Sequence, residues 1–347
     1  METKDYLDRV KKDIDLGRIL GILEKAGNLN VLVIGDTIID HYIFVRPKGR
    51  AIKDPILSAE YLSDETYAGG ILAIANHLSD FVSKVKVVTL LGDRNDKLSL
   101  IKGSVRKNVE LKTFTKKDSH TIIKKRYIDS NRNNKLFKVE YMNDRPITDA
   151  LAQEITAYLD AELPKHDLVV VGDFGHGFIN DAIKRKLEER SKFLSVNVQS
   201  NSANMGYNYF TLYNKMDFIS MDEQELRLPL HRRFEDIKEV IKEAYNKFRL
   251  ENFMITRGKY GSMFVSSGRI TEAPILTLSV KDTVGAGDAL FAITSLFVYL
   301  KADSSIIPII ANSAGGIAAN IMGNKESVTK ESLLNFIRNI KEGKNLC

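Results

Sequence analysis

The residues with the clearest chemical potential stand in one short run, Gly285-Ala286-Gly287-Asp288, directly before an apolar segment. Glycines let backbone N–H groups approach a ligand closely, and the first turn of a helix adds N–H groups without acceptors and a positive dipole end. Such a run can hold the negative charge of a phosphoryl group in transfer, while Asp288 accepts a proton from an attacking hydroxyl. Because an N-capping aspartate leaves the same short pattern, the run alone is weak evidence for a catalytic site.

The elements that must position this run alternate along the chain. Short apolar runs predict strands, and longer periodic segments predict helices. The predicted strands are 31–36, 85–92, 167–173, 193–198 and 252–258, and 217–228 is expected to be a strand that runs into a helix. The predicted helices are 69–81, 182–190, 288–300 and 304–321. This alternation predicts an α/β fold, in which a mostly parallel sheet carries helices on both faces.

Polar residues and glycines gather where the predicted strands end. Asp36, Asp173, Glu223, Gly258 and Asp288 all follow predicted strands or open predicted helices. Ligands of open parallel sheets bind at this carboxyl edge. Any one of these residues could simply belong to a turn or a helix cap, but their accumulation at one edge predicts a site.

Two regions break the alternation and predict a small β lid. Half-exposed strands are expected at 41–47 with 59–67, and at 120–130 with 135–142, so the lid is assigned to about 41–67 and 119–143. Apolar and charged residues alternate in the last strand, which suits a sheet with one wet face. Residues 1–27 are predicted as one charged amphipathic helix ending at Gly27, residues 28–335 as the main domain and residues 336–347 as a tail.

The composition excludes several classes of protein. The chain has 347 residues, 44% of them hydrophobic, and a formal net charge of +6. This charge favours anionic small molecules and does not indicate nucleic-acid binding. The only cysteine is Cys347, which excludes an internal disulfide framework, and no histidine spacing suits zinc. The charged start and the lack of a long apolar stretch predict a cytoplasmic protein without a membrane partner.

The segment DTVGAGD at residues 282–288 resembles the signature of the ribokinase or phosphofructokinase-B superfamily of ATP-dependent sugar kinases, and the resemblance extends over about residues 28–335. It implies a ribokinase-like fold, ATP and Mg²⁺, with Asp288 as catalytic base and Gly285, Ala286 and Gly287 as an anion hole. Glu223 is implied to help place the magnesium. The implied nucleotide contacts are Thr256, Arg257, Gly258, Gly261, Asp282 and Asn312.

Within that superfamily the chain looks most similar to the kinase part of bacterial heptose-phosphate kinases. The resemblance lies in GDTIIDHY at 35–42, GDFGHG at 172–177, and IKKR at 123–126 followed by LFKVE at 136–140. It implies phosphorylation of the anomeric hydroxyl of a heptose 7-phosphate. The expected substrate contacts are Asp36, Asp40, Gly69, Gly70, Asn76, Arg126 and Asp173. An exposed lid strand is expected to pair with its twin in a homodimer.

Several positions depart from the family pattern and keep alternatives open. Ala73 stands where the family has an asparagine, for which Asn76 is a candidate substitute, and Ser220 replaces another asparagine. Asn197 and Gln199 replace an acid and a lysine, and residues 199–208 form an unusually polar loop. The alternatives are therefore a kinase for another sugar or a nucleoside, or a catalytically idle partner or scaffold of a nucleotidyltransferase. Arg126 is either a phosphate contact or part of a solvated strand edge.

Overall fold

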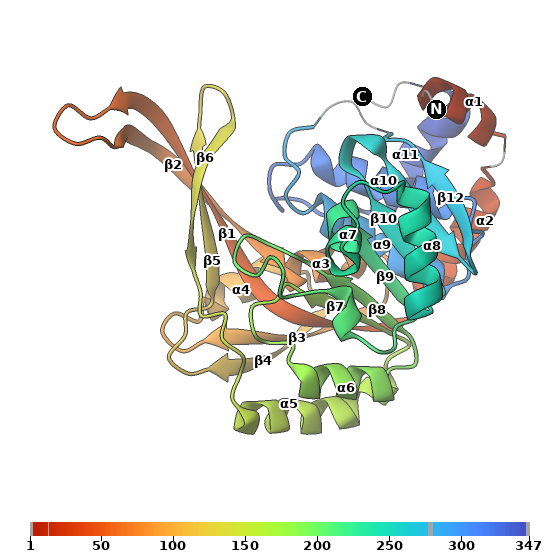
Figure 1. Cartoon of the computed structure of the whole chain (residues 1–347), viewed down its shortest axis with the longest axis horizontal. Helices are drawn as coiled ribbons and strands as arrows, with labels where there is room; N and C mark the ends of the chain where they lie inside the picture. The colour runs from red at the N-terminus through yellow and green to blue at the C-terminus, as the bar shows by residue number, and fades with distance from the viewer. Residues whose placement is uncertain (1–2, 13, 277–279, 345–347) are drawn as a thin grey trace.

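A mostly parallel sheet forms the centre of the molecule (Figure 1), as the alternating sequence pattern predicts. The computed structural model describes residues 3–12, 14–276 and 280–344. The sheet order is β12-β11-β10-β9-β8-β7-β1-β3-β4, parallel from β10 to β4, with β11 and β12 antiparallel at one edge. Its strands are β1 (Asn30–Arg50), β3 (Lys84–Gly92), β4 (Val109–Lys116), β7 (Leu168–Asp173), β8 (Leu194–Val198), β9 (Phe218–Asp222), β10 (Asn252–Thr256), β11 (Ser262–Ser266) and β12 (Arg269–Ala273).

Helices cover both faces of this sheet, and each face has its own apolar core. One face carries α1 (Thr3–Val10), α2 (Leu16–Ala26), α3 (Ile71–Ser79), α4 (Leu98–Ser104), α9 (Ala286–Tyr299), α10 (Ile307–Ala319) and α11 (Lys330–Glu342). The other carries α5 (Asp149–Glu162), α6 (Asp181–Arg190), α7 (Glu223–Leu230) and α8 (Ile237–Phe248). Short 3-10 turns lie at Leu163–Lys165, Phe210–Leu212 and Gly258–Tyr260. Since α9 and α10 are apolar nearly all round, they are buried against neighbouring helices.

The lid projects from the sheet as two arms (Figure 1). The second half of β1 pairs antiparallel with β2 (Leu57–Gly70) and parallel with β5 (Ile122–Asp129), and β5 pairs antiparallel with β6 (Asn134–Tyr141). One continuous strand of 21 residues, β1, thus joins the main sheet to the lid. The sequence predicted its two halves as separate strands. The same strand therefore carries Asp36 in its main-sheet half and Asp40 in its lid half.

The two ends of the chain differ in detail from the sequence prediction. Residues 1–27 contain two helices rather than one, because the Asp15 side chain accepts hydrogen bonds from Gly17 and Arg18 and caps a new helix. Gly27 ends that helix, as predicted. At the other end, α11 runs across residue 335, and its Ile337 and Ile340 are buried in the core. In the part of the chain that the structure describes, no helix has the length and apolarity of a membrane span.

Candidate active site

A cavity of about 380 Å³ opens beside the first turn of α9. Six of the predicted nucleotide and anion-hole residues line it, namely Thr256, Gly258, Gly261, Ala286, Gly287 and Asn312. Gly261 has a φ of +86°, and a Cβ there would overlap the Ala273 carbonyl oxygen, so this turn requires glycine. The amide of Asn312 donates to the carbonyl oxygens of Ala273 and Pro274, at 3.0 and 2.8 Å, and so fixes the cavity wall.

The three residues before Asp288 form the start of α9. Gly285 is the N-cap with a φ of +83°, and a Cβ there would overlap the side-chain oxygen of Asn324. Gly287 differs, since it lies inside the helix, has no positive φ and has open space where a Cβ would point. The backbone N–H groups of this first turn have no acceptor four residues earlier within the helix. Gly285 is therefore required by the fold, whereas the space at Gly287 is available to a ligand.

Asp288 is buried at the same turn, with 8% of its surface exposed. Burial raises the pKa of its carboxyl to about 7, and the negative charge of Asp40 adds to this effect. The Gln199 side chain donates to Asp288 Oδ1 at 3.0 Å, which opposes the rise by stabilising the ionised form. A carboxyl with this pKa accepts a proton readily near neutral pH.

Asp40 faces Asp288 from the lid half of β1. Its Oδ1 pairs with the Arg126 guanidinium, and its Oδ2 accepts from the Asn324 side chain at 3.3 Å. A Cβ on Gly69 would overlap Asp40 Oδ2, so the predicted pair of glycines allows β2 to pass close to this carboxylate. The structure thus brings Asp40, Gly69, Arg126 and Asp288 together.

Asp36 and Asp173 lie in a second buried cluster, and the charge of Lys124 lowers the pKa of Asp36 as it does that of Asp288. Burial raises the pKa of Asp36 to about 7, and the charge of Asp173 contributes. Asp173 is held by Tyr213 at 2.9 Å and by Asn208 and the Gly175 N–H. Beside them His176 is 2% exposed, and burial lowers the pKa of its imidazole to about 3. The two aspartates therefore lie below the site and do not line the cavity.

Asp282, predicted to contact the nucleotide, instead joins the lid to the start of α9. The Tyr42 hydroxyl donates to its Oδ2 at 2.5 Å and the Lys135 ammonium to its Oδ1 at 2.6 Å. The backbone N–H groups of Val284 and Gly323 also donate to it. Burial would raise the pKa of Asp282, but these partners, led by Lys135, lower it. The Asp282 carboxylate thus connects the lid to the turn at the start of α9.

Three further predicted residues lie elsewhere or are already engaged. Asn76 donates to the Ser104 carbonyl and accepts from the Arg106 N–H, so it supports the link after α4 and does not replace the missing asparagine. Arg257 and Arg227 both pair with Glu223, at 2.7 Å each. Burial would raise the pKa of Glu223, and these two arginines lower it. Arg257 therefore points to Glu223 rather than lining the cavity.

The same contacts bear on the predicted magnesium site. Both Glu223 oxygens are occupied by guanidinium groups, and the described residues contain no group of three or more His, Cys, Asp or Glu side chains placed to hold a metal ion. Magnesium in such enzymes is bound largely by substrate phosphates and water. The side chains present do not form a magnesium cage of their own, and Glu223 is not a free ligand.

Sequence reasoning missed the residues that connect distant segments. Tyr42 and Lys135 reach Asp282 across 240 and 147 positions of the chain, and Asn324 reaches Asp40 across 284. Gln199 was noted only as a departure from a pattern, although it contacts the candidate base. Their types gave no signal, because a single Tyr, Lys, Asn or Gln outside a motif is usually a surface residue.

Comparison with known proteins decides the family. Residues 28–299 match the sequence profile of the pfkB family carbohydrate kinases. The chain belongs to this family. As a pfkB family member it is an ATP-dependent carbohydrate kinase, and the predicted family and fold are confirmed. The kinase is 24% identical to the bifunctional protein HldE of Nitratiruptor sp. over 90% of this chain, and 21% identical to HldE of Trichlorobacter lovleyi over 89% of it.

The pfkB family kinase spans 66% and 63% of the lengths of these two relatives. Among solved structures it resembles the ribokinase of Thermotoga maritima, with a TM-score of 0.69, 14% identity and coverage of 90% of this chain and 100% of that one. Phosphofructokinase-2 of Escherichia coli in complex with fructose-6-phosphate gives a TM-score of 0.69 at 12% identity, covering 90% and 99%. At these identities the structures establish the fold alone.

Proposed function

We propose that this kinase transfers the γ-phosphoryl group of ATP to a hydroxyl of a phosphorylated sugar, with a heptose 7-phosphate as the first candidate acceptor. One observation carries the proposal. Asp288 is buried directly after Gly287, which lines the cavity; the charge of Asp40 acts on it, and burial raises the pKa of its carboxyl to about 7. A base between a phosphate-sized opening and a hydroxyl-binding acid is what phosphoryl transfer to an alcohol requires.

The reaction follows from the positions of these groups. ATP lies in the cavity that Asn312 and the glycines line, with its phosphates toward the first turn of α9. Asp288 takes the proton of the acceptor hydroxyl as that oxygen bonds to the γ-phosphorus and the bond to ADP breaks. The N–H group of Gly287 offsets the charge on the phosphoryl oxygens, while that of Ala286 already donates to the Thr283 carbonyl at 3.3 Å. We expect Mg²⁺ to arrive bound to the phosphates, because the residues that the structure describes contain no group of three or more acidic, His or Cys side chains to hold it.

Asp40 is proposed to bind acceptor hydroxyls. Its carboxylate already accepts from Arg126 and Asn324, which fix its orientation. Carboxylates accept well from neighbouring hydroxyls of a sugar, and the lack of a side chain at Gly69 allows β2 to pack directly against the Asp40 carboxylate. Asp36 and Asp173 are proposed to shape the floor of this site.

For an acceptor phosphate, Lys124 fits better than Arg126. Arg126 is already paired with Asp40, whereas the nearest carboxylate oxygen to the Lys124 ammonium is that of Glu140, at 3.7 Å. Lys124 is 8% exposed, and burial lowers the pKa of its ammonium. A buried cation without a close hydrogen-bond acceptor is stabilised by a bound anion. The similarity to HldE is consistent with a heptose phosphate acceptor.

The acceptor is tested with matched pairs of sugar and sugar phosphate, heptose 7-phosphate included, by comparing kcat/KM for ATP-dependent phosphorylation. We expect phosphorylated acceptors to be preferred at least tenfold, and Lys124→Met to reduce this preference. Lys125→Met is the control, because Lys125 is the next residue of β5 and points to the opposite face. Equal preference in all three proteins would favour a neutral sugar or a nucleoside. No turnover with any acceptor would favour the scaffold role.

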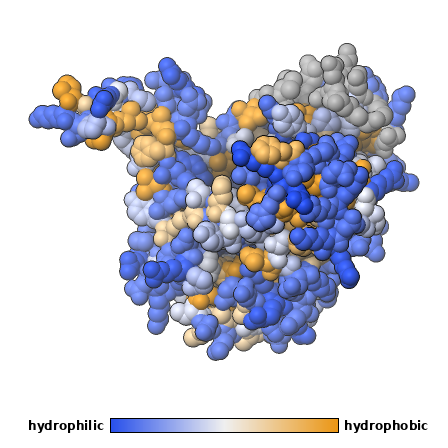
Figure 2. Space-filling model, viewed as in Figure 1, coloured by the Kyte–Doolittle hydropathy of each residue, from blue (hydrophilic) through white to orange (hydrophobic). Residues whose placement is uncertain are grey.

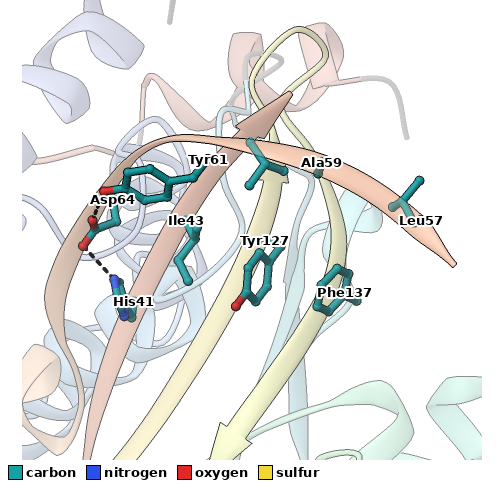
Figure 3. A pocket seen from close by; sticks show the side chains of 9 residues that line it. His41, Ile43, Leu57, Ala59, Tyr61, Asp64, Tyr127 and Phe137 are labelled. Atoms are coloured by element: carbon teal, nitrogen blue, oxygen red, sulfur yellow. Dashed lines mark hydrogen bonds and ion pairs between the residues drawn. The ribbon is translucent and has the colours of Figure 1, made fainter. Parts of the chain in front are cut away.

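We also propose that two copies pair through the outer face of the lid. The face toward the site carries charged side chains such as Lys124 and Arg126, whereas the outer face carries several exposed apolar side chains besides Lys125, and Figure 2 shows hydrophobic residues among hydrophilic ones on the projecting lid. A hollow of about 440 Å³ on it is lined mainly by apolar side chains, including Ile43, Tyr61, Tyr127 and Phe137 (Figure 3). Exposed patches of this kind mark interfaces, and a second copy presents a matching apolar lid.

Light scattering after size exclusion tests this pairing. We expect twice the mass of one chain at micromolar concentration, and a single chain for the double variant Tyr61→Asp with Phe137→Asp. Phe234→Asp is the matched control, because Phe234 is 87% exposed but lies between α7 and α8, outside the lid. A wild-type monomer, or a dimer that survives the double lid variant, contradicts the lid interface.

A further inference from the structure

The side chain of Gln199 links the candidate base to a chain of buried amides. Its Nε2 donates to Asp288 Oδ1 at 3.0 Å and to Asn197 Oδ1 at 2.9 Å. Asn197 in turn donates through Nδ2 to the Ser220 carbonyl oxygen at 2.8 Å. Asn197 and Ser220 are 7% and 2% exposed. The carboxyl group is therefore anchored to β8 and β9 rather than to its own helix alone.

This chain of hydrogen bonds allows only one orientation of each amide. If the Gln199 amide were turned over, its oxygen would face the oxygens of Asp288 and Asn197. If the Asn197 amide were turned over, its oxygen would face the Ser220 carbonyl. The backbone of Gln199 is fixed as well, since its N–H donates to the Asp173 carbonyl at 2.9 Å and its carbonyl accepts from Asn208 at 3.3 Å. Gln199 thus presents a fixed donor to Asp288.

We propose that Gln199, held by Asn197, is a positioning residue that fixes Asp288 with Oδ1 occupied and Oδ2 turned to the acceptor hydroxyl. The inference rests on the proposed role of Asp288 as base and adds a residue that no comparison assigns. Residues 197 and 199 are two neutral amides, which hold the carboxylate without adding a positive charge beside it.

The charged groups around Asp288 set its pKa, and the effect of residue 199 on that pKa can be measured against them. Asp40 raises the pKa of Asp288 and Lys124 lowers it, while the charge of Asp288 adds to the rise in the pKa of Glu225, which lies on α7. Against this background a neutral donor at position 199 lowers the pKa modestly, and a cation there lowers it further. The pH below which activity falls therefore reports on residue 199, provided that Asp288 must be ionised for turnover.

The test compares Gln199→Met and Gln199→Lys with the wild type, using the pH dependence of kcat/KM. Gln199→Met keeps the length and loses the donor, so we expect a fall of roughly ten- to hundredfold in kcat, little change in the KM for ATP, and an acidic limb moved to higher pH. Gln199→Lys moves the acidic limb to lower pH. Thermal unfolding checks that both variants fold.

Asn204→Ala provides the control for a merely structural effect. Asn204 lies in the same polar loop, is 7% exposed, and its side chain donates to the Phe174 carbonyl rather than to Asp288. We expect it to lower the melting temperature while leaving the acidic limb in place. An unchanged limb in both Gln199 variants overturns the positioning role. If Asp288→Asn itself retains turnover, the proposed function fails instead, so the two failures are distinguishable.

Discussion

Asp288 and Asp36 are two buried carboxyl groups with nearly the same electrostatics and different surroundings. In each, burial is the main cause that raises the pKa to about 7, and a second aspartate adds to the rise. Asp288 opens α9 beside the 380 Å³ cavity and receives the Gln199 donor. Asp36 lies where β1 leaves the main sheet, and its Oδ2 has no hydrogen-bond partner among the described residues.

The comparison separates two meanings of a raised pKa. A raised pKa alone reports burial, and it suits catalysis only where substrate can reach the group. The hollow beside Asp36 has room for about one water molecule, so no sugar or nucleotide phosphate fits there. Asp288, in contrast, adjoins both the cavity and Asp40. Position relative to the cavity, rather than the pKa, assigns the base to Asp288.

The largest expected effect is a loss of turnover that distinguishes Asp288 from Asp36. Asp288→Asn keeps the size of the side chain and removes proton acceptance, so we expect kcat to fall by about a hundredfold or more with ATP binding nearly unchanged. Asp36→Asn should reduce kcat by no more than a few-fold. Steady-state kinetics with a calorimetric titration of ATP measures both quantities. Equal losses in the two variants would contradict the assignment of the base, and so would near-normal turnover of Asp288→Asn.

One glycine lies near each of these two carboxyl groups, and replacing it by alanine tests whether the position serves function or stability. Gly287→Ala places a methyl group in open space beside Asp288, so we expect an unchanged melting temperature and a loss of activity on the order of tenfold. Gly177, next to His176, has a φ of +85°, and a Cβ there would overlap the Arg145 carbonyl oxygen. Gly177→Ala should therefore lower stability by about 1–3 kcal/mol.

Kinetics and thermal melts of the two glycine variants are read together. A Gly287→Ala protein that is fully active would show that no phosphate passes close to that Cβ. A Gly177→Ala protein as stable as the wild type would show that the loop beside Asp36 adapts, and would remove the distinction between a functional and a structural glycine.

The sequence predicted the parts of the site that are local. Asp288, Gly285 and the glycines of the nucleotide cavity stand in short motifs whose geometry depends on neighbouring residues, and the structure brings them together. The alternation of strands and helices predicted the sheet in the same way. The contacts of Asp282 with Tyr42 and Lys135 could not be predicted, because they depend on how the lid returns to the sheet across more than 140 residues. Asn76 was misassigned for the related reason that spacing does not show which way a side chain points.

The last expected effect concerns the pH dependence of stability rather than turnover. The pKa of Asp36 is about 7 in the folded protein and 3.8 in an unfolded reference, so the folded state binds more protons between about pH 4 and pH 7. Stability associated with this group is therefore full below about pH 4 and is lost as the pH rises toward 7, by at most about 1.4 kcal/mol per pH unit.

Asp36→Asn cannot ionise at this position. In urea unfolding, its free energy of unfolding should therefore rise relative to that of the wild type from pH 5 to pH 8. Asp288→Asn should gain by a similar amount, because burial raises the pKa of Asp288 to about 7 as well, with the Gln199 hydrogen bond opposing that rise as the His176 backbone does at Asp36. Parallel pH dependences for the wild type and Asp36→Asn would show that Asp36 is ionised throughout this range, and the two carboxyl groups would then differ in charge as well as in position.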